Sequence, residues 1–103
     1  HFPCSLHSIA FSMRDKSMEP EILSGDIVVI DPQIEPLPGD LVLIRVIHAD
    51  TLVLRKYSRA PAGGVVLLPT NPLWEEIRLT SQEWEADVRL IGVMSERTTP
   101  RRA

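Results

Sequence analysis

The stretch Gly25-Asp26-Ile27-Val28-Val29-Ile30-Asp31 decides the fold class of this chain. It is a short run of β-branched residues that follows a glycine. Such runs between turn residues are typical of β-strands, because branched side chains pack well on a pleated sheet. The stretch therefore predicts a strand from Asp26 to Asp31.

Similar apolar runs recur along the whole chain, separated by nine prolines and five glycines. They are Ile9 to Met13, Leu41 to Ile47, Thr51 to Tyr57, Val65 to Leu68 and Val88 to Met94. Helical structure is expected only as one or two turns at Met18 to Leu23 and another turn at Ser81 to Ala86. Six or seven short strands at this spacing predict a mostly β fold, a coiled sheet or partly open barrel.

Length and composition indicate one ordinary globular domain. The chain has 103 residues, 44% of them hydrophobic and 24% charged. We expect a single domain over residues 1–103, with a lead-in at 1–8 and a flexible tail at 98–103. The net charge of −3 argues against a dedicated nucleic-acid binder. The small cluster of Arg97, Arg101 and Arg102 is interpreted as a solvated charge run in the tail.

Cysteine content and hydropathy suggest a cytoplasmic protein without a membrane span. Cys4 is the single cysteine, so no internal disulfide can form. No apolar run approaches the roughly 18 residues of a span, and residues 1–8 lack the features of a signal peptide. The chain does not begin with Met, which suggests a fragment. Cys4 and His7 have a metal-like spacing, but two ligands do not make a zinc site, so neither metal nor cofactor is expected.

Ser17, in Asp15-Lys16-Ser17-Met18-Glu19-Pro20, is the first candidate for chemistry. It lies between a predicted strand and a predicted helical turn. Backbone N–H groups at the start of such a turn are unpaired and can stabilise an oxyanion. The alternative is that Ser17 serves only as an N-cap.

Lys56 is the second candidate. On a strand alternate residues share a face, so Leu52, Leu54 and Lys56 are expected to point the same way. A lysine at the end of an apolar stripe is partly desolvated, which lowers its pKa toward the range that a general base needs. The alternative is a lysine that extends from the strand end into solvent.

The order of these motifs resembles the LexA/UmuD/phage-repressor family of Ser-Lys peptidases. The resemblance runs from about Phe11 to Arg97. It is carried by five segments, namely 17–20 with 25–31, 38–42, 54–56, 68–72 and 91–94. Together they imply a LexA-like fold with Ser17 as nucleophile and Lys56 as general base. They also imply an oxyanion hole from the backbone N–H groups of Ser17 and Lys16, with Met18 lining the site.

Members of this family join such a domain to an N-terminal helix-turn-helix that binds DNA. They form homodimers, and they cut their own interdomain linker when a RecA–single-stranded-DNA filament promotes it in the SOS response. The resemblance thus implies the autoproteolysis and dimerisation domain of a transcriptional repressor. We expect that DNA-binding domain to lie outside the 103 residues given.

Two departures keep other functions open. Many members have Gly-Asp before the serine, where this chain has Asp15-Lys16. Family members cut at Ala-Gly or Cys-Gly, and neither pair precedes Ser17; Ala62-Gly63 is read as a hairpin turn. A catalytically silent oligomerisation and regulatory module is therefore an alternative, and a signal-peptidase-like enzyme is another. Val88 to Met94 is considered as an edge strand for dimer contacts.

Overall fold

The computed structural model describes residues 7–98, which form seven strands and one short helix. The elements are β1 (Ile9–Ser12), β2 (Ile27–Asp31), β3 (Leu41–Val46), β4 (Thr51–Arg59), β5 (Val65–Leu68), β6 (Ile77–Leu79), α1 (Ser81–Ala86) and β7 (Val88–Thr98). The predicted mostly β fold is confirmed. The expected lead-in up to residue 6, Cys4 included, and the expected tail from residue 99 lie outside the described residues.

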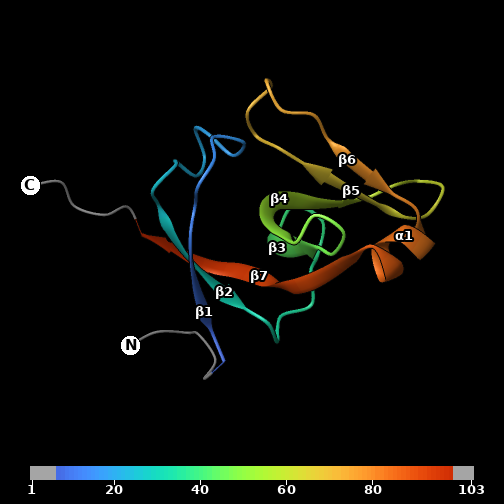
Figure 1. Cartoon of the computed structure of the whole chain (residues 1–103), viewed down its shortest axis with the longest axis horizontal. Coiled ribbons are helices and arrows are strands. Elements are labelled where there is room, and N and C mark those ends of the chain that lie inside the picture. Colours follow the sequence, from blue (N-terminus) through green and yellow to red (C-terminus); the bar gives the residue numbers. More distant parts are fainter. Residues whose placement is uncertain (1–6, 99–103) are drawn as a thin grey trace, which may run out of the picture.

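All seven strands belong to one antiparallel sheet in the order β1-β2-β7-β3-β4-β5-β6. Figure 1 shows β1 and β6 far apart at the two ends of this coiled sheet. Strand β7 lies between β2 and β3 in the sheet, so Val88 to Met94 is not an edge along its whole length: β2 pairs with β7 from Val93 to Thr98, and among the described residues Val88 to Leu90 pair with β3. The long β7 therefore joins the two halves of the sheet.

The six predicted strands are confirmed, and the helical turn predicted at Ser81 to Ala86 is α1. Thr80 caps this helix: its Oγ1 accepts from the Glu83 N–H, and the Glu83 carboxylate accepts from the Thr80 N–H. The turns predicted at Met18 to Leu23 do not form a helix, although the Ile22 N–H donates to the Met18 carbonyl. α1 is short, and no helix among residues 7–98 is long and apolar enough to cross a membrane.

The core has two parts because strand residues alternate between two faces. Leu41 and Leu43 of β3 point into the first cluster, whereas Val42 and Ile44 point into the second. The first cluster also takes Met13, Met18, Ile22, Val28, Ile30 and Leu54. It lies under the segment that carries Ser17, so the fold of that segment depends on this core.

Candidate functional site

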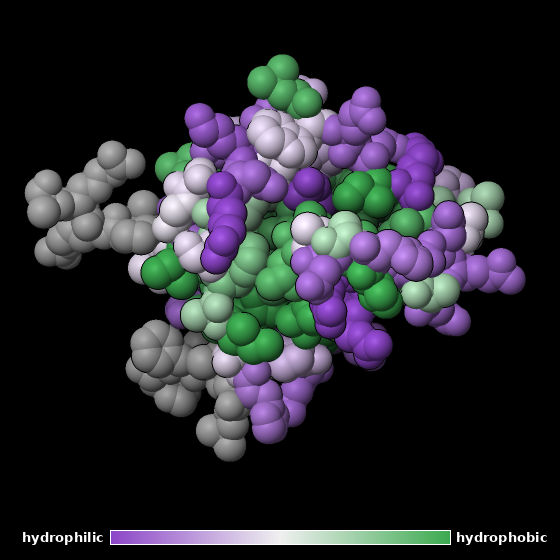
Figure 2. Space-filling view, viewed as in Figure 1, coloured by the Kyte–Doolittle hydropathy of each residue, from purple (hydrophilic) through white to green (hydrophobic). Residues whose placement is uncertain are grey.

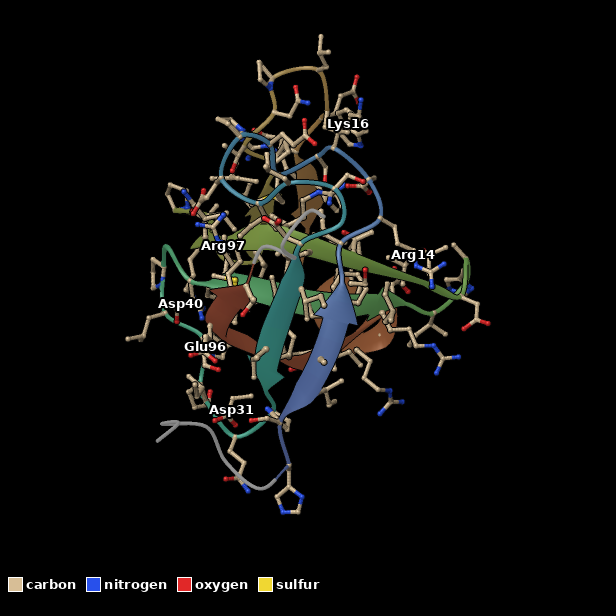
Figure 3. All side chains as sticks on the ribbon, turned by 90° about the vertical axis from the view of Figure 1, so that its left-hand side faces the viewer. Arg14, Lys16, Asp31, Asp40, Glu96 and Arg97 are labelled. Carbon is tan, nitrogen blue, oxygen red and sulfur yellow. The ribbon has the colours of Figure 1, made fainter. Side chains whose placement is uncertain are left out.

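Ser17 lies in the long loop of a β-hairpin, here called the Ser17 loop (residues 13–26). Strands β1 and β2 pair antiparallel, and two backbone bonds extend their ladder into the loop. The Met13 N–H donates to the Asp26 carbonyl at 2.8 Å, and the Gly25 N–H donates to the Met13 carbonyl at 2.7 Å. The base of the loop is thereby fixed to the sheet, and Figure 3 shows Arg14 and Lys16 on the part that continues from β1.

The turn after β5 holds the tip of the Ser17 loop from the other side. The Ser17 carbonyl accepts from the backbone N–H groups of Thr70 at 3.0 Å and Asn71 at 2.9 Å. The Asn71 side chain also donates from Nδ2 to the Lys16 carbonyl at 2.9 Å. These three bonds, together with the buried side chain of Met18 below, fix the backbone on both sides of Ser17.

The Ser17 hydroxyl is fully buried and lies between an acceptor and a donor. Its Oγ donates to Asp15 Oδ1 at 2.6 Å and accepts from Arg55 Nη1 at 2.7 Å. The Ser17 backbone N–H also donates to Asp15 Oδ1, at 2.9 Å. Asp15, Ser17 and Arg55 thus form one charged and hydrogen-bonded network, which we call the Ser17 network.

Arg55 is the side chain that completes this network from β4. It is only 5% exposed, and its Nη1 donates to the Leu54 carbonyl at 2.8 Å as well as to Ser17. Burial lowers the pKa of the Arg55 guanidinium from its ordinary value, and the charge of Asp15 opposes that shift. Its Nε is buried without a hydrogen-bond partner. A guanidinium has donors but no acceptor, and it keeps its proton in proteins.

Lys56 has a different neighbour from the one expected. Its Nζ lies 3.4 Å from Glu21 Oε1, and its side chain is 39% exposed. Glu21 Oε1 also accepts from Thr70 Oγ1 at 3.1 Å. The structure therefore brings Lys56 to Glu21 and brings Arg55 to the Ser17 hydroxyl. The desolvated cation of β4 is Arg55, the residue next to the one that the sequence indicated.

The other predicted site residues are also placed by the structure. The Ser17 N–H, expected in an oxyanion hole, is occupied by Asp15. The Lys16 side chain is exposed, while its carbonyl accepts from Glu19 and Asn71. Met18 packs in the first core cluster and does not line the open cleft beside Ser17. Arg97 is not part of a free tail, since its Nη1 lies 3.4 Å from Asp26 Oδ2.

An open cleft of about 460 Å³ runs between the Ser17 hairpin and β4. One wall is residues 10–15 and the other is residues 51–54. Each wall includes a strand edge: among residues 7–98, β1 (to Ser12) pairs with β2 alone, and β5 pairs with β4 only from Lys56 to Arg59. Figure 2 shows hydrophobic side chains gathered in a hollow near the middle of this face. The cleft thus places unpaired strand backbone next to a mixed lining of apolar and polar side chains, with Asp15 of the Ser17 network among them.

Potential metal ligands do not cluster in the described part of the chain. Among residues 7–98 there is no group of three His, Cys, Asp or Glu side chains that could hold an ion. His7 lies at the start of the described range, and its expected partner Cys4 lies outside it. The cleft and the Ser17 network are therefore the candidate site.

Comparison with known proteins assigns the chain to a family. The family model described as Peptidase S24-like matches residues 3–95, and the chain belongs to that family. It is 28% identical over 94 residues to the LexA repressor of Petrotoga mobilis, which is 90% of this chain and 45% of the relative. It is 36% identical over 91 residues to the LexA repressor of Desulfatibacillum aliphaticivorans, which is 85% of this chain and 43% of the relative. The chain thus spans less than half the length of these repressors.

Proposed function

We propose that this chain is the C-terminal regulatory domain of a LexA-type transcriptional repressor, and that its cleft binds an extended polypeptide segment. The observation that carries the proposal is the pair of free strand edges that line the cleft, at residues 10–12 and 51–54. Family membership and the two LexA repressors support the class of protein.

Unpaired strand edges favour strand addition. Their free N–H and C=O groups are a template for another extended chain, and the main-chain bonds supply affinity. The cleft walls add apolar contacts from Phe11, Leu52 and Val53. A strand that enters here would pass the Ser17 network. A linker segment of the same polypeptide is the ligand that this arrangement suits best, because an attached segment binds at a high effective concentration.

Peptide binding can be measured with a defined probe. We would use the acetylated and amidated heptapeptide Val-Thr-Val-Ala-Gly-Val-Thr with a fluorophore, and follow its anisotropy as the chain is added. The control peptide carries proline in place of the third and fifth residues, because proline cannot donate to a strand ladder. The proposal predicts saturable binding of the first peptide, and binding of the control at least about tenfold weaker. Equal binding of the two peptides would contradict strand addition.

A matched pair of variants locates the binding. Leu52 lines the cleft and is 46% exposed, whereas Leu73 is 86% exposed and does not line it. Leu52→Glu places a charge in the apolar cleft and should abolish binding, while Leu73→Glu should leave it unchanged. If both variants bind like the parent chain, the peptide is not in this cleft.

Self-cleavage by Ser17 and Lys56 is a second candidate function. It is favoured by the position of Lys56, whose strand neighbour Leu54 packs in the same core cluster as Met18. Lys56 would have to exchange Glu21 for the Ser17 hydroxyl. The test is incubation of the full-length protein at rising pH, where cleavage should increase and should vanish in Ser17→Ala and Lys56→Ala. Cleavage that survives Ser17→Ala would sink this candidate.

The remaining expectations concern the whole protein and stay predictions. For a repressor of this class we expect a homodimer in the cytoplasm, DNA contact through a separate N-terminal domain, and stimulation by a RecA–single-stranded-DNA filament. A signal-peptidase-like enzyme is disfavoured, because the relatives that match are repressors. Sequence upstream of residue 1 separates these classes directly.

A further inference from the structure

We propose that Arg55 holds Ser17 in a non-nucleophilic state, so that the cleft retains a bound polypeptide strand and does not cut it. The inference rests on the proposed polypeptide binding and assigns the chemistry of the site. It starts from one contact: the cation that reaches the Ser17 hydroxyl is the guanidinium of Arg55.

A serine attacks only if a neighbouring base takes its proton as the bond to carbon forms. The base of a Ser-Lys pair is a neutral amine. At the Ser17 hydroxyl the cation is Arg55, whose Nη1 donates to Oγ at 2.7 Å. It therefore uses a lone pair of the oxygen and cannot accept the proton. A basic side chain at this position would activate Ser17, whereas Arg55 only donates a hydrogen bond to its hydroxyl oxygen.

Asp15 does not replace the missing base. Its Oδ1 accepts from the Ser17 hydroxyl at 2.6 Å, but a carboxylate is a far weaker base than a neutral amine. The same oxygen accepts from the Ser17 N–H at 2.9 Å. That N–H is the donor that an oxyanion would need, so the Asp15 carboxylate occupies the place of the developing negative charge. Asp15 and Arg55 thus satisfy the serine from both sides.

Lys56 lies outside this network. Its Nζ is 3.4 Å from Glu21, and its side chain remains 39% exposed. The Ser17 hydroxyl has its two partners in Asp15 and Arg55 among the described residues. A lysine amine at position 55 would differ from that of Lys56, because it would be buried and would lie within reach of Ser17 Oγ. Burial lowers the pKa of an amine and favours the neutral form that a base requires.

The test uses the 103-residue chain and diisopropyl fluorophosphate, a reagent that reports a nucleophilic serine without any bound peptide. In the reaction the Ser17 Oγ–phosphorus bond forms, the phosphorus–fluorine bond breaks, fluoride leaves and the hydroxyl proton passes to the base. Labelling is followed by intact mass at pH 6 to 10. The chains compared are the wild type, Arg55→Lys, Arg55→Lys with Ser17→Ala, and Lys56→Met.

The proposal predicts no label on the wild type or on Lys56→Met. Arg55→Lys should be labelled at Ser17 at least about 100-fold faster, the usual contribution of a general base, and faster as pH rises. The double variant should stay unlabelled. Wild-type labelling at Ser17 that is lost in Lys56→Met would overturn the proposal, and so would a folded Arg55→Lys chain that stays unreactive.

A measurement on the wild type keeps the proposal testable if Arg55→Lys does not fold. Two hydrogen bonds from Nη1, to Ser17 Oγ and the Leu54 carbonyl, should slow rotation of the guanidinium. Nitrogen NMR should then resolve separate Nη signals for Arg55. One averaged signal would contradict the proposal that Arg55 holds the Ser17 hydroxyl. Peptide binding, measured by anisotropy, is a separate result. If the wild type is phosphorylated at Ser17 and still binds the heptapeptide, only the proposed role of Arg55 is refuted. If Ser17 is unreactive and the chain does not bind the heptapeptide, the proposed function is refuted.

Discussion

Arg55 Nη1 lies 2.7 Å from Ser17 Oγ, although the two residues are 38 positions apart in the sequence. Arg55 lies on β4 directly before the stretch that pairs with β5, and its side chain reaches the Ser17 loop from there. Asp15 supplies the balancing negative charge from within the loop. The buried serine hydroxyl is thus bonded to one side chain from its own loop and one from β4.

Removing the Ser17 hydroxyl should destabilise the fold. Ser17→Ala leaves Arg55 and Asp15 without a shared partner in a buried place. A buried polar group that loses its partner costs about 1–3 kcal/mol. We expect that loss in urea unfolding, with Ser58→Ala on β4 as the matched control near zero. A Ser17→Ala chain as stable as the wild type would mean that the Ser17 network contributes nothing.

Replacing Arg55 by lysine should make stability depend on pH. Arg55 keeps its proton at every ordinary pH, so it gives the wild type no such dependence between pH 6 and 10. A buried lysine has a folded-state pKa below its unfolded value, so the unfolded chain binds more protons. Stability of Arg55→Lys relative to wild type should therefore rise with pH, by at most about 1.4 kcal/mol per unit. Thermal unfolding between pH 6 and 10 measures this difference in stability. A difference that does not change with pH would show that the lysine amine reaches solvent in the folded chain.

The Lys56–Glu21 pair should contribute little to stability. Both side chains are about two-fifths exposed, and ion pairs of this kind contribute less than about 1 kcal/mol. Lys56→Met should change the free energy of unfolding by no more than that, and the change should shrink in 1 M salt. A loss of several kcal/mol would indicate that Lys56 has a buried partner in solution and would favour the Ser17–Lys56 dyad.

Gly92 fixes the close approach of β7 to β2. A Cβ at this position would lie 2.7 Å from the Asp31 carbonyl oxygen, which is backbone and cannot move aside. Gly92→Ala should destabilise the sheet by about 1–3 kcal/mol, the usual result of overpacking. Arg89→Ala, at an exposed position of the same strand, is the control. Equal melting temperatures for the two variants would contradict this packing.

Local sequence was enough for most of the fold. Short β-branched runs between turn residues marked six strands, and Thr80 with Glu83 stabilises the helical turn that the sequence indicated. β6 was missed because Ile77 to Leu79 is only three residues long. The central place of β7 could not be predicted, since it depends on pairing with β2 and β3 far away in the sequence.

The partner of Ser17 on β4 could not be predicted either, because it depends on contacts between residues that are far apart in the sequence. The sequence predicts Ser17 with Lys56 as its partner on β4, whereas the structure places Arg55, one residue away, at the Ser17 hydroxyl. Strand alternation correctly separates these two residues, yet both reach the Ser17 loop, and alternation cannot say which of them meets Ser17 and which meets Glu21. A charged residue between the apolar Val53 and Tyr57 was the available signal, because a buried arginine needs partners.

Binding of an extended polypeptide in the cleft is the central claim, and the most direct test is an NMR titration of the labelled chain with the Val-Thr-Val-Ala-Gly-Val-Thr peptide. If a strand adds to the free edges, amide shifts should concentrate at residues 10–15 and 51–54, and those amides should gain protection from solvent exchange. Shifts confined to β6 or to the turn at residues 69–76, with residues 51–54 unchanged, would contradict the account.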